Sequence, residues 1–256
     1  KQCQDSYHPY GCLYTRTTGI WQTVWLEYVP TGYIKTVKYY PDIKEAAFDI
    51  ELTLSKSGKV TAEAFYEGAP VGNAVKETDG NYLRLKLPLT EKHLWEVGHG
   101  RLYDLKLTLE TEDGTDELFS YAGLREVRLD GFKFMLNGKS VFQRTALDQG
   151  YYPDGIYTAP SDEDLKRDIE MSMEIGFNGA RLHEKIFEPR FLYYCDKAGY
   201  LVWGEHANWG LDVDSTEALL NFLPEWSESV ERDFNHPSII GWCPLNETWN
   251  NIGKNA

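Results

Sequence analysis

The chain has 256 residues, 42% of them hydrophobic and 14% aromatic, which is enough for one large domain or two ordinary ones with substantial cores. Its net charge of −14 disfavours a nucleic-acid partner, because phosphate binding relies on dense lysine and arginine. No apolar run approaches the roughly 18 residues of a membrane-spanning helix. Four cysteines are too few for a disulfide scaffold, and no ligand spacing indicates a metal or another cofactor.

Residues 1–29 contain one predicted strand, Trp21–Val29, after a loop rich in glycine and threonine. One strand is not a domain, so we expect this stretch to be the C-terminal end of a β-domain whose body lies upstream. The chain also lacks an initiator methionine. We therefore expect it to be an internal piece of a longer protein.

Residues 30–124 have the pattern of an all-β domain. Apolar and polar residues alternate with a period of two, and Gly-containing turn signals such as Asp79-Gly80-Asn81 separate the runs. About seven short strands in this length favour an immunoglobulin-like β-sandwich. The predicted strands are Tyr33–Tyr40, Ala46–Leu54, Lys59–Tyr66, Ala74–Glu77, Tyr82–Leu87, Tyr103–Glu110 and Thr115–Phe119.

From residue 125 to residue 256 the pattern changes to strands that alternate with helices. Such alternation predicts a parallel sheet, and the absence of a glycine-rich phosphate loop favours a (β/α) barrel over a nucleotide-binding sheet. The apolar stripe of the longest helix, which includes Leu219, Leu223 and Trp226, is predicted to face inward. In chain order the expected elements are a hairpin of Arg128–Leu136 and Lys139–Leu147 around Asn137-Gly138, a helix over Ser161–Ile175, the strand Phe177–Leu182, the helix Pro189–Ala198, the strand Tyr200–Gly204, the helix Ser215–Phe234 and the strand Ser238–Cys243.

Charged and amide side chains recur just after four successive strands of this region. In a (β/α) barrel the functional groups lie at these strand ends, so the side chains are expected to converge on one rim. They are Asp148 and Gln149, then Arg181, His183 and Glu184, then Glu205, His206, Asn208 and Trp209, and finally Asn246, Glu247, Trp249 and Asn250.

Each of these residues also has a purely structural interpretation. Arg181 and Glu205 could simply be partners of each other, and His183 could be a structural histidine. Asp148 could cap the turn into Gly150. Glu247 has the strongest case for function, because an amide and two tryptophans surround it in the sequence. Hydrolysis of a glycosidic bond is the chemistry that would use this set, since one carboxylic acid protonates the leaving oxygen and a second carboxylate attacks the anomeric carbon.

Four stretches of the chain resemble family 2 of the glycoside hydrolases, the group of β-galactosidases, β-glucuronidases and β-mannosidases. The resemblance implies the end of a jelly-roll domain over 1–29, an immunoglobulin-like sandwich over 30–124 and the N-terminal half of a (β/α)8 TIM barrel over 125–256. The stretches are Thr18–Glu27; Leu124–Val127 with Leu136–Lys139; Gly176–Arg181 with Cys195–Gly199; and Arg232–Trp242 with Asn246-Glu247.

By this resemblance Glu247 is the acid/base, and Asn246 contacts the sugar's 2-hydroxyl. The other expected substrate-binding residues are Arg181, His183, Glu205, Asp148, Asn208 and Trp249. The pattern that follows the second strand in the family is Arg-x-Ser-His-Tyr, whereas this chain has Arg181-Leu-His-Glu-Lys185, so Glu184 stands at the position of the family's histidine. Because of these departures the resemblance does not identify the sugar that is hydrolysed, although a β-galactosidase-like activity is favoured.

The family's nucleophile is a glutamate near the end of the seventh barrel strand, beyond residue 256. We therefore expect a retaining exo-β-glycosidase whose 256-residue piece is inactive alone and self-associates through the open half barrel. The alternatives are a non-catalytic carbohydrate-binding module and a structural spacer.

Overall fold

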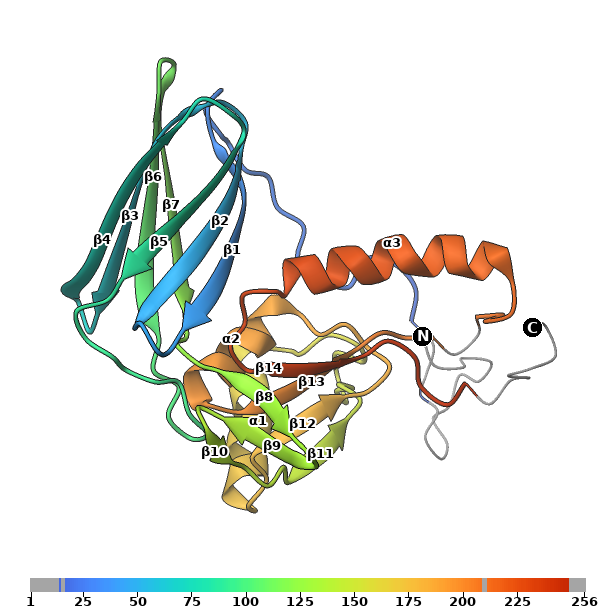
Figure 1. Ribbon diagram of the computed structural model, residues 1–256. Coiled ribbons are helices and arrows are strands. Elements are labelled where there is room, and N and C mark those ends of the chain that lie inside the picture. The colour runs from blue at the N-terminus through green and yellow to red at the C-terminus, as the bar shows by residue number, and fades with distance from the viewer. Residues whose placement is uncertain (1–13, 15–16, 209–210, 249–256) are drawn as a thin grey trace.

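In the computed structural model, which describes residues 14, 17–208 and 211–248, the chain has an all-β part and an α/β part (Figure 1). The all-β part consists of two antiparallel sheets with strand orders β1-β2-β5 and β4-β3-β6-β7. All seven strands predicted in this stretch are confirmed. They are β1 (Ile34–Asp42), β2 (Ala47–Leu54), β3 (Gly58–Tyr66), β4 (Ala69–Thr78), β5 (Tyr82–Pro88), β6 (Tyr103–Thr111) and β7 (Gly114–Ala122).

The two sheets share one hydrophobic core, because each of them turns alternate side chains towards the other. On β5 the alternation is strict, with Leu83, Leu85 and Leu87 buried and the residues between them exposed. Phe48 on β2 and Leu107 on β6 are fully buried in the same core. The predicted period of two is therefore confirmed in these strands.

A small antiparallel sheet with the order β10-β9-β8 follows the two larger sheets. Its strands are β8 (Val127–Asp130), β9 (Lys133–Leu136) and β10 (Lys139–Ser140). The predicted Asn137-Gly138 turn joins β9 to β10, and both of its residues have positive φ angles. The prediction of one strand over Arg128–Leu136 is wrong, because Gly131, with φ at 59°, makes a second turn between β8 and β9.

The α/β part is built on a four-stranded parallel sheet with the sequential order β11-β12-β13-β14. Ser161 caps the first helix, since its Oγ accepts a hydrogen bond from the Asp164 N–H at 3.3 Å, and Gly199 ends the second helix in a left-handed conformation. The strands are β11 (Thr145–Asp148), β12 (Gly179–Leu182), β13 (Leu201–Glu205) and β14 (Ile239–Cys243), and the helices are α1 (Asp162–Glu174), α2 (Pro189–Ala198) and α3 (Thr216–Arg232).

Two further expectations are wrong for the described residues. Trp21–Val29 forms no strand, and Leu26 and Tyr28 are fully exposed, because none of the described strands pairs with this segment. The predicted inward face of α3 is wrong for Leu219 and Leu223, which are 51% and 47% exposed, whereas Trp226 packs against Trp242 of β14. An apolar stripe indicates which face of a helix is suited to packing, but not which part of the chain packs against it.

No helix among the described residues has the length and apolarity needed to cross a membrane.

Candidate active site

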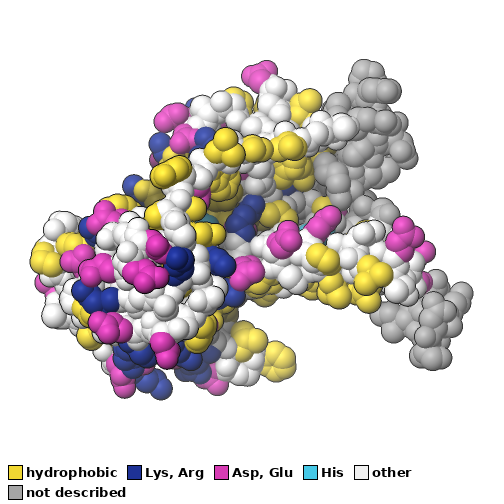
Figure 2. Space-filling view, turned by 90° about the horizontal axis from the view of Figure 1, so that it is seen from above, with side chains coloured by type: hydrophobic (Ala, Val, Ile, Leu, Met, Phe, Trp, Pro, Cys, Tyr) yellow, Lys and Arg dark blue, Asp and Glu magenta, His cyan; other side chains and the backbone are white. Residues whose placement is uncertain are grey.

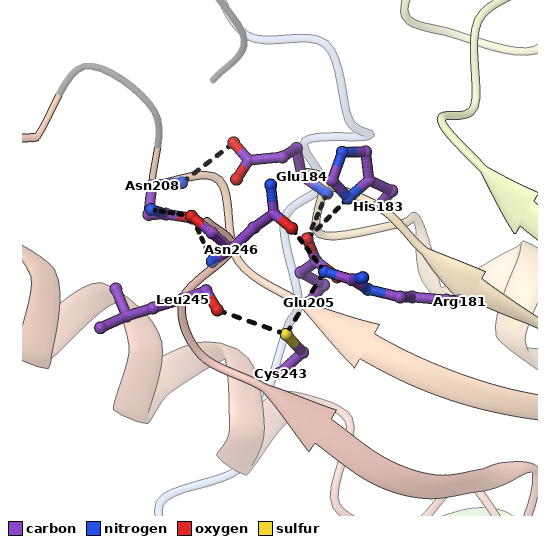
Figure 3. A network of polar contacts seen from close by, with 8 residues as sticks. All are labelled: Arg181, His183, Glu184, Glu205, Asn208, Cys243, Leu245 and Asn246. Carbon is purple, nitrogen blue, oxygen red and sulfur yellow. Dashed lines mark hydrogen bonds and ion pairs between the residues drawn. The ribbon is translucent and has the colours of Figure 1, made fainter. Parts of the chain in front are cut away.

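The C-terminal ends of β12, β13 and β14 meet at one edge of the parallel sheet, because the three strands run in the same direction. Polar side chains at these ends form one hydrogen-bonded cluster, which we call the strand-end network (Figure 3). Six of the residues predicted for the rim are in it. The strand-end network consists of Arg181, His183, Glu184, Glu205, Asn208 and Asn246.

Glu205, the last residue of β13, is the centre of the network. Its side chain is fully buried and accepts hydrogen bonds from Arg181 Nε at 2.5 Å, His183 Nδ1 at 2.9 Å and the Glu184 N–H at 3.1 Å. A carboxylate can only accept, so Nδ1 of His183 carries the proton in this contact. The Glu205 carboxylate also raises the pKa of Arg181. The structural interpretation of Arg181 and Glu205 as partners is thus confirmed.

Asn246, which follows β14, is held by a side chain from β12 and by one from the loop after β13. Arg181 Nη2 donates to Asn246 Oδ1 at 2.7 Å. Asn208 Nδ2 donates to the Asn246 carbonyl at 2.9 Å, and the Asn246 N–H donates back to Asn208 Oδ1 at 2.7 Å. Only Nδ2 of the Asn246 side chain, which is buried, has no hydrogen-bond partner in the described part of the chain. Buried donors are normally paired, so this N–H is well suited to receive an acceptor from a ligand.

Glu184 belongs to the network and was expected at the rim, but it was not among the predicted catalytic or substrate-binding residues. It is only 1% exposed, and its Oε2 accepts a hydrogen bond from the Asn208 N–H at 3.1 Å. Its φ angle of 53° lies in the left-handed region, which is unusual for a residue with a side chain. The signal for Glu184 was present in the sequence, since it follows a predicted strand and replaces the family's histidine.

Lys185 is a second residue that sequence reasoning missed. It is 4% exposed, and its ammonium group donates to the carbonyls of Gly150 at 2.5 Å and Tyr157 at 2.9 Å. The same nitrogen lies 4.4–4.9 Å from the ring centres of Trp21, Tyr157 and Phe187. Lys185 thereby joins the loop after β12 to the loop after β11 and to the N-terminal segment. No local pattern could have indicated it, because the surrounding rings come from distant segments.

Glu247 lies at the rim beside the network and is exposed to solvent. Among the described residues it has no hydrogen-bond or ion-pair partner. Like Glu184, it is a non-glycine residue in the left-handed region, with φ at 49°. Such backbone outliers occur frequently at functional sites, which makes the position consistent with a role in chemistry. Trp249, the last residue of the predicted set, lies outside the described residues.

Asp148 is not part of the network, although it ends the neighbouring strand β11. Its Oδ1 accepts a hydrogen bond from the Gly150 N–H at 2.8 Å, so the turn-capping interpretation is confirmed. It lines a separate cavity of about 580 Å³ together with Tyr151, Asp168 and Tyr200. Burial raises the pKa of Asp148 above its ordinary value of 3.8.

The raised pKa of Asp148 predicts a pH-dependent effect of Asp148→Asn. The pKa of Asp148 is higher in the folded chain than in the unfolded chain, so the protonated form of this residue favours the folded state. That contribution to stability is lost as the pH rises through the folded pKa. Asparagine keeps the acceptor for Gly150 and carries no charge. We expect Asp148→Asn to raise the melting temperature at neutral pH and to have little effect below about pH 4, measured by thermal unfolding at several pH values. The exposed Asp130→Asn is the control, and a gain that is the same at every pH would contradict the prediction.

The described residues contain no group of three or more His, Cys, Asp or Glu side chains arranged to hold a metal ion. In the strand-end network, the buried carboxylate of Glu205 is compensated by Arg181, by His183 and by a backbone N–H group.

Comparisons with known proteins find similarity to one family of glycosidases. Residues 32–125 match the family described as glycosyl hydrolases family 2. A putative β-glucuronidase of Formosa agariphila is 28% identical over 90% of this chain and 29% of its own length. A β-galactosidase of Leuconostoc mesenteroides is 27% identical over 91% of this chain and 25% of its own length. A β-galactosidase of Vibrio vulnificus is 31% identical over 66% of this chain and 17% of its own length. The chain therefore spans less than a third of the length of these curated relatives.

Among solved structures, a β-glucuronidase from Ruminococcus gnavus in complex with an N1-substituted uronic isofagomine superposes with a TM-score of 0.78. It is 22% identical and covers 89% of this chain, which corresponds to 39% of that chain. The structure of the same enzyme without ligand gives a TM-score of 0.73 at 22% identity, over 84% and 37% of the two chains. At this level of identity the likeness establishes a shared fold.

Proposed function

Because the chain belongs to family 2 of the glycosyl hydrolases, we propose that it carries the acid/base half of a site that hydrolyses terminal β-linked sugars with retention of configuration. In this proposal Glu247 is the acid/base and Asn246 the contact to the 2-hydroxyl. The observation that carries the proposal is the buried Nδ2 of Asn246, which has no hydrogen-bond partner among the described residues, beside a solvent-accessible Glu247. The amide would donate to a sugar hydroxyl, while the neighbouring carboxyl group reaches the glycosidic oxygen.

We also propose that the parallel sheet is the first half of a (β/α)8 barrel over residues 125–256, and that residues 30–124 form an immunoglobulin-like domain. The order of the strands supports the barrel. In an open nucleotide-binding sheet the order reverses at a switch point, whereas β11, β12, β13 and β14 are neighbours in sequential order. The polar residues lie at the C-terminal ends of the strands, as in barrel enzymes.

A retaining mechanism needs a second carboxylate about 5–5.5 Å from the acid/base. Glu205 cannot supply it, because its side chain is fully buried and is held by Arg181 and His183. Glu184 is buried as well. We therefore propose that the nucleophile is a glutamate outside these 256 residues. That the chain self-associates through its open sheet stays a prediction.

The test compares the purified 256-residue chain with a longer polypeptide that contains it. The longer protein is expected to hydrolyse nitrophenyl β-galactoside or β-glucuronide, and the chain alone is expected to show no turnover above the uncatalysed rate. Turnover by the chain alone that disappears in Glu247→Gln would contradict the placement of the nucleophile. Sugar binding without turnover in the longer protein would instead favour a carbohydrate-binding module.

A further inference from the structure

The start of β14 is held by the segment that connects β7 to β8, at the opposite end of the strand from Asn246. Val202 on β13 pairs with Ile239 by donating its N–H to the Ser238 carbonyl at 2.8 Å. The Ile239 carbonyl, one residue further on, consequently points to the other edge of β14. Arg125 occupies this edge, donating from Nη2 to the Ile239 carbonyl at 2.7 Å and from Nε to the Pro237 carbonyl at 2.5 Å.

The buried Asp196 on α2 holds the same segment from the other side. Its carboxylate is fully buried and accepts three hydrogen bonds, two from the loop before β14 and one from β7. The Ser238 N–H donates to Oδ1 at 2.9 Å, while His236 Nδ1 at 2.6 Å and the Tyr121 hydroxyl at 2.9 Å donate to Oδ2. Tyr121 belongs to β7, so this carboxylate joins the all-β part, α2 and the beginning of β14. Burial lowers the pKa of Arg125 to about 10, and the charge of Asp196 opposes this shift, so Arg125 stays charged at neutral pH.

Asn235 adds a third connection, to the edge strand β1. Its side-chain amide accepts from the Tyr39 N–H at 3.0 Å and donates to the Val37 carbonyl at 2.9 Å. These two backbone groups lie on the same edge of β1, so the amide takes the place of a neighbouring strand. Close packing completes the contact: a Cβ atom added to Gly123 would lie 2.7 Å from Cβ of Pro237.

We propose that Arg125, Tyr121, Asp196 and Asn235 form an interdomain latch that sets the position of β14 along its neighbour β13. The latch thereby positions Asn246 at the far end of the strand. A slip of β14 by one residue would move that end by about 3.3 Å and turn its side chains to the opposite face. The 2.7 Å bond from Arg181 to Asn246 would not survive such a slip. The latch itself does not depend on the proposed reaction; only its consequence for the proposed sugar contact of Asn246 does.

The thiol of Cys243, the last residue of β14, can be used to detect a displacement of the C-terminal end of this strand. It is half-buried, with Sγ 3.6 Å from Arg181 Nη2 and 3.5 Å from the Leu245 carbonyl. Cys195 is fully buried on α2, next to Asp196, so it becomes reactive only when α2 itself opens. With Cys3 and Cys12 replaced by serine, the two remaining thiols separate a local displacement of β14 from general unfolding.

The test measures the rate at which a small maleimide modifies each thiol in the otherwise native chain. Arg125→Met removes both hydrogen bonds. We expect it to speed modification of Cys243 by at least about tenfold, since the loss of one charged hydrogen bond already has an effect of that size, while Cys195 stays unmodified. Arg125→Lys keeps the charge and can reach one carbonyl, so its modification rate at Cys243 is expected to lie between those of Arg125→Met and the parent chain. Arg128→Met, at an exposed residue three positions further on, is the matched control and should have no effect.

An unchanged rate at Cys243 in Arg125→Met would overturn the proposal. So would a rise at Cys243 and Cys195 in equal proportion, because that indicates general loss of stability. If Arg125→Met does not fold, the modification rates of Cys243 and Cys195 are compared in Tyr121→Phe and Arg125→Lys, and the same outcomes support or overturn the proposal. Hydrogen exchange gives an independent readout: faster exchange confined to Ile239–Cys243 supports the latch, whereas equal acceleration in Tyr103–Thr111 contradicts it.

Discussion

In a polypeptide that contains this chain and hydrolyses β-glycosides, Glu247→Gln is expected to lower kcat by about 10²–10⁴-fold, which is the usual contribution of a general acid/base. Glutamine preserves the shape of the side chain but cannot transfer the proton. The loss should be largest for alkyl β-glycosides, whose leaving group needs protonation, and smaller for nitrophenyl β-glycosides. The measurement is kcat for both substrate types at neutral pH.

Added azide sharpens this test, because azide attacks the glycosyl-enzyme without help from a general base. It should restore part of the turnover of Glu247→Gln on nitrophenyl substrates and yield a β-glycosyl azide. The exposed Glu228→Gln on α3 is the matched control and should leave kcat unchanged. Stability should also stay the same in Glu247→Gln, since Glu247 is exposed and has no hydrogen-bond partner among the described residues. An unchanged kcat on alkyl glycosides would rule out Glu247 as the acid/base.

Glu205→Ala is expected to destabilise the chain by about 3 kcal/mol, because it leaves the Arg181 guanidinium without its buried partner. The expected value lies at the low end for a buried ion pair, since the Arg181 side chain is 35% exposed and water screens part of its charge. His183 Nδ1 and the Glu184 N–H also lose their acceptor. Urea unfolding followed by tryptophan fluorescence measures the effect in the α/β part, because all eight tryptophans lie outside strands β1–β7.

A double-mutant cycle tests whether the ion pair is the cause. Arg181→Met combined with Glu205→Leu removes both charges, so the double variant should be destabilised by clearly less than the sum of the single variants. Glu110→Ala is the control, since it removes an exposed pair with Lys59 that water screens, and it should have little effect on stability. Additive losses in the cycle would show that Arg181 and Glu205 do not act as a pair.

Much of the site was predictable because of the way parallel strands place their ends. Arg181, Glu205 and Asn246 were expected at one rim, and the structure joins them in one network with Asn208. Asp148 was expected there too, yet its carboxylate caps the turn to Gly150 and lines another cavity. A position at the end of a strand specifies the edge of the sheet, but the direction of the side chain depends on the turn that follows.

The sequence by itself determined the elements whose signals are local. The seven strands of the all-β part follow from alternating burial, and the turn at Asn137-Gly138 and the end of α2 at Gly199 follow from backbone conformations that glycine favours. These features depend on neighbouring residues only, so a linear pattern contains them. The family resemblance added the roles expected of Asn246 and Glu247.

Only the tertiary structure decided which distant residues become partners. The aromatic rings around Lys185, the carbonyls held by Arg125 and the backbone groups of β1 bound by Asn235 all come from segments far away in the chain. The physical reason is that a buried charge or amide must be satisfied by whatever polar or aromatic group packing brings within reach. Packing also left the apolar stripe of α3 partly exposed among the described residues, which the helical pattern could not reveal.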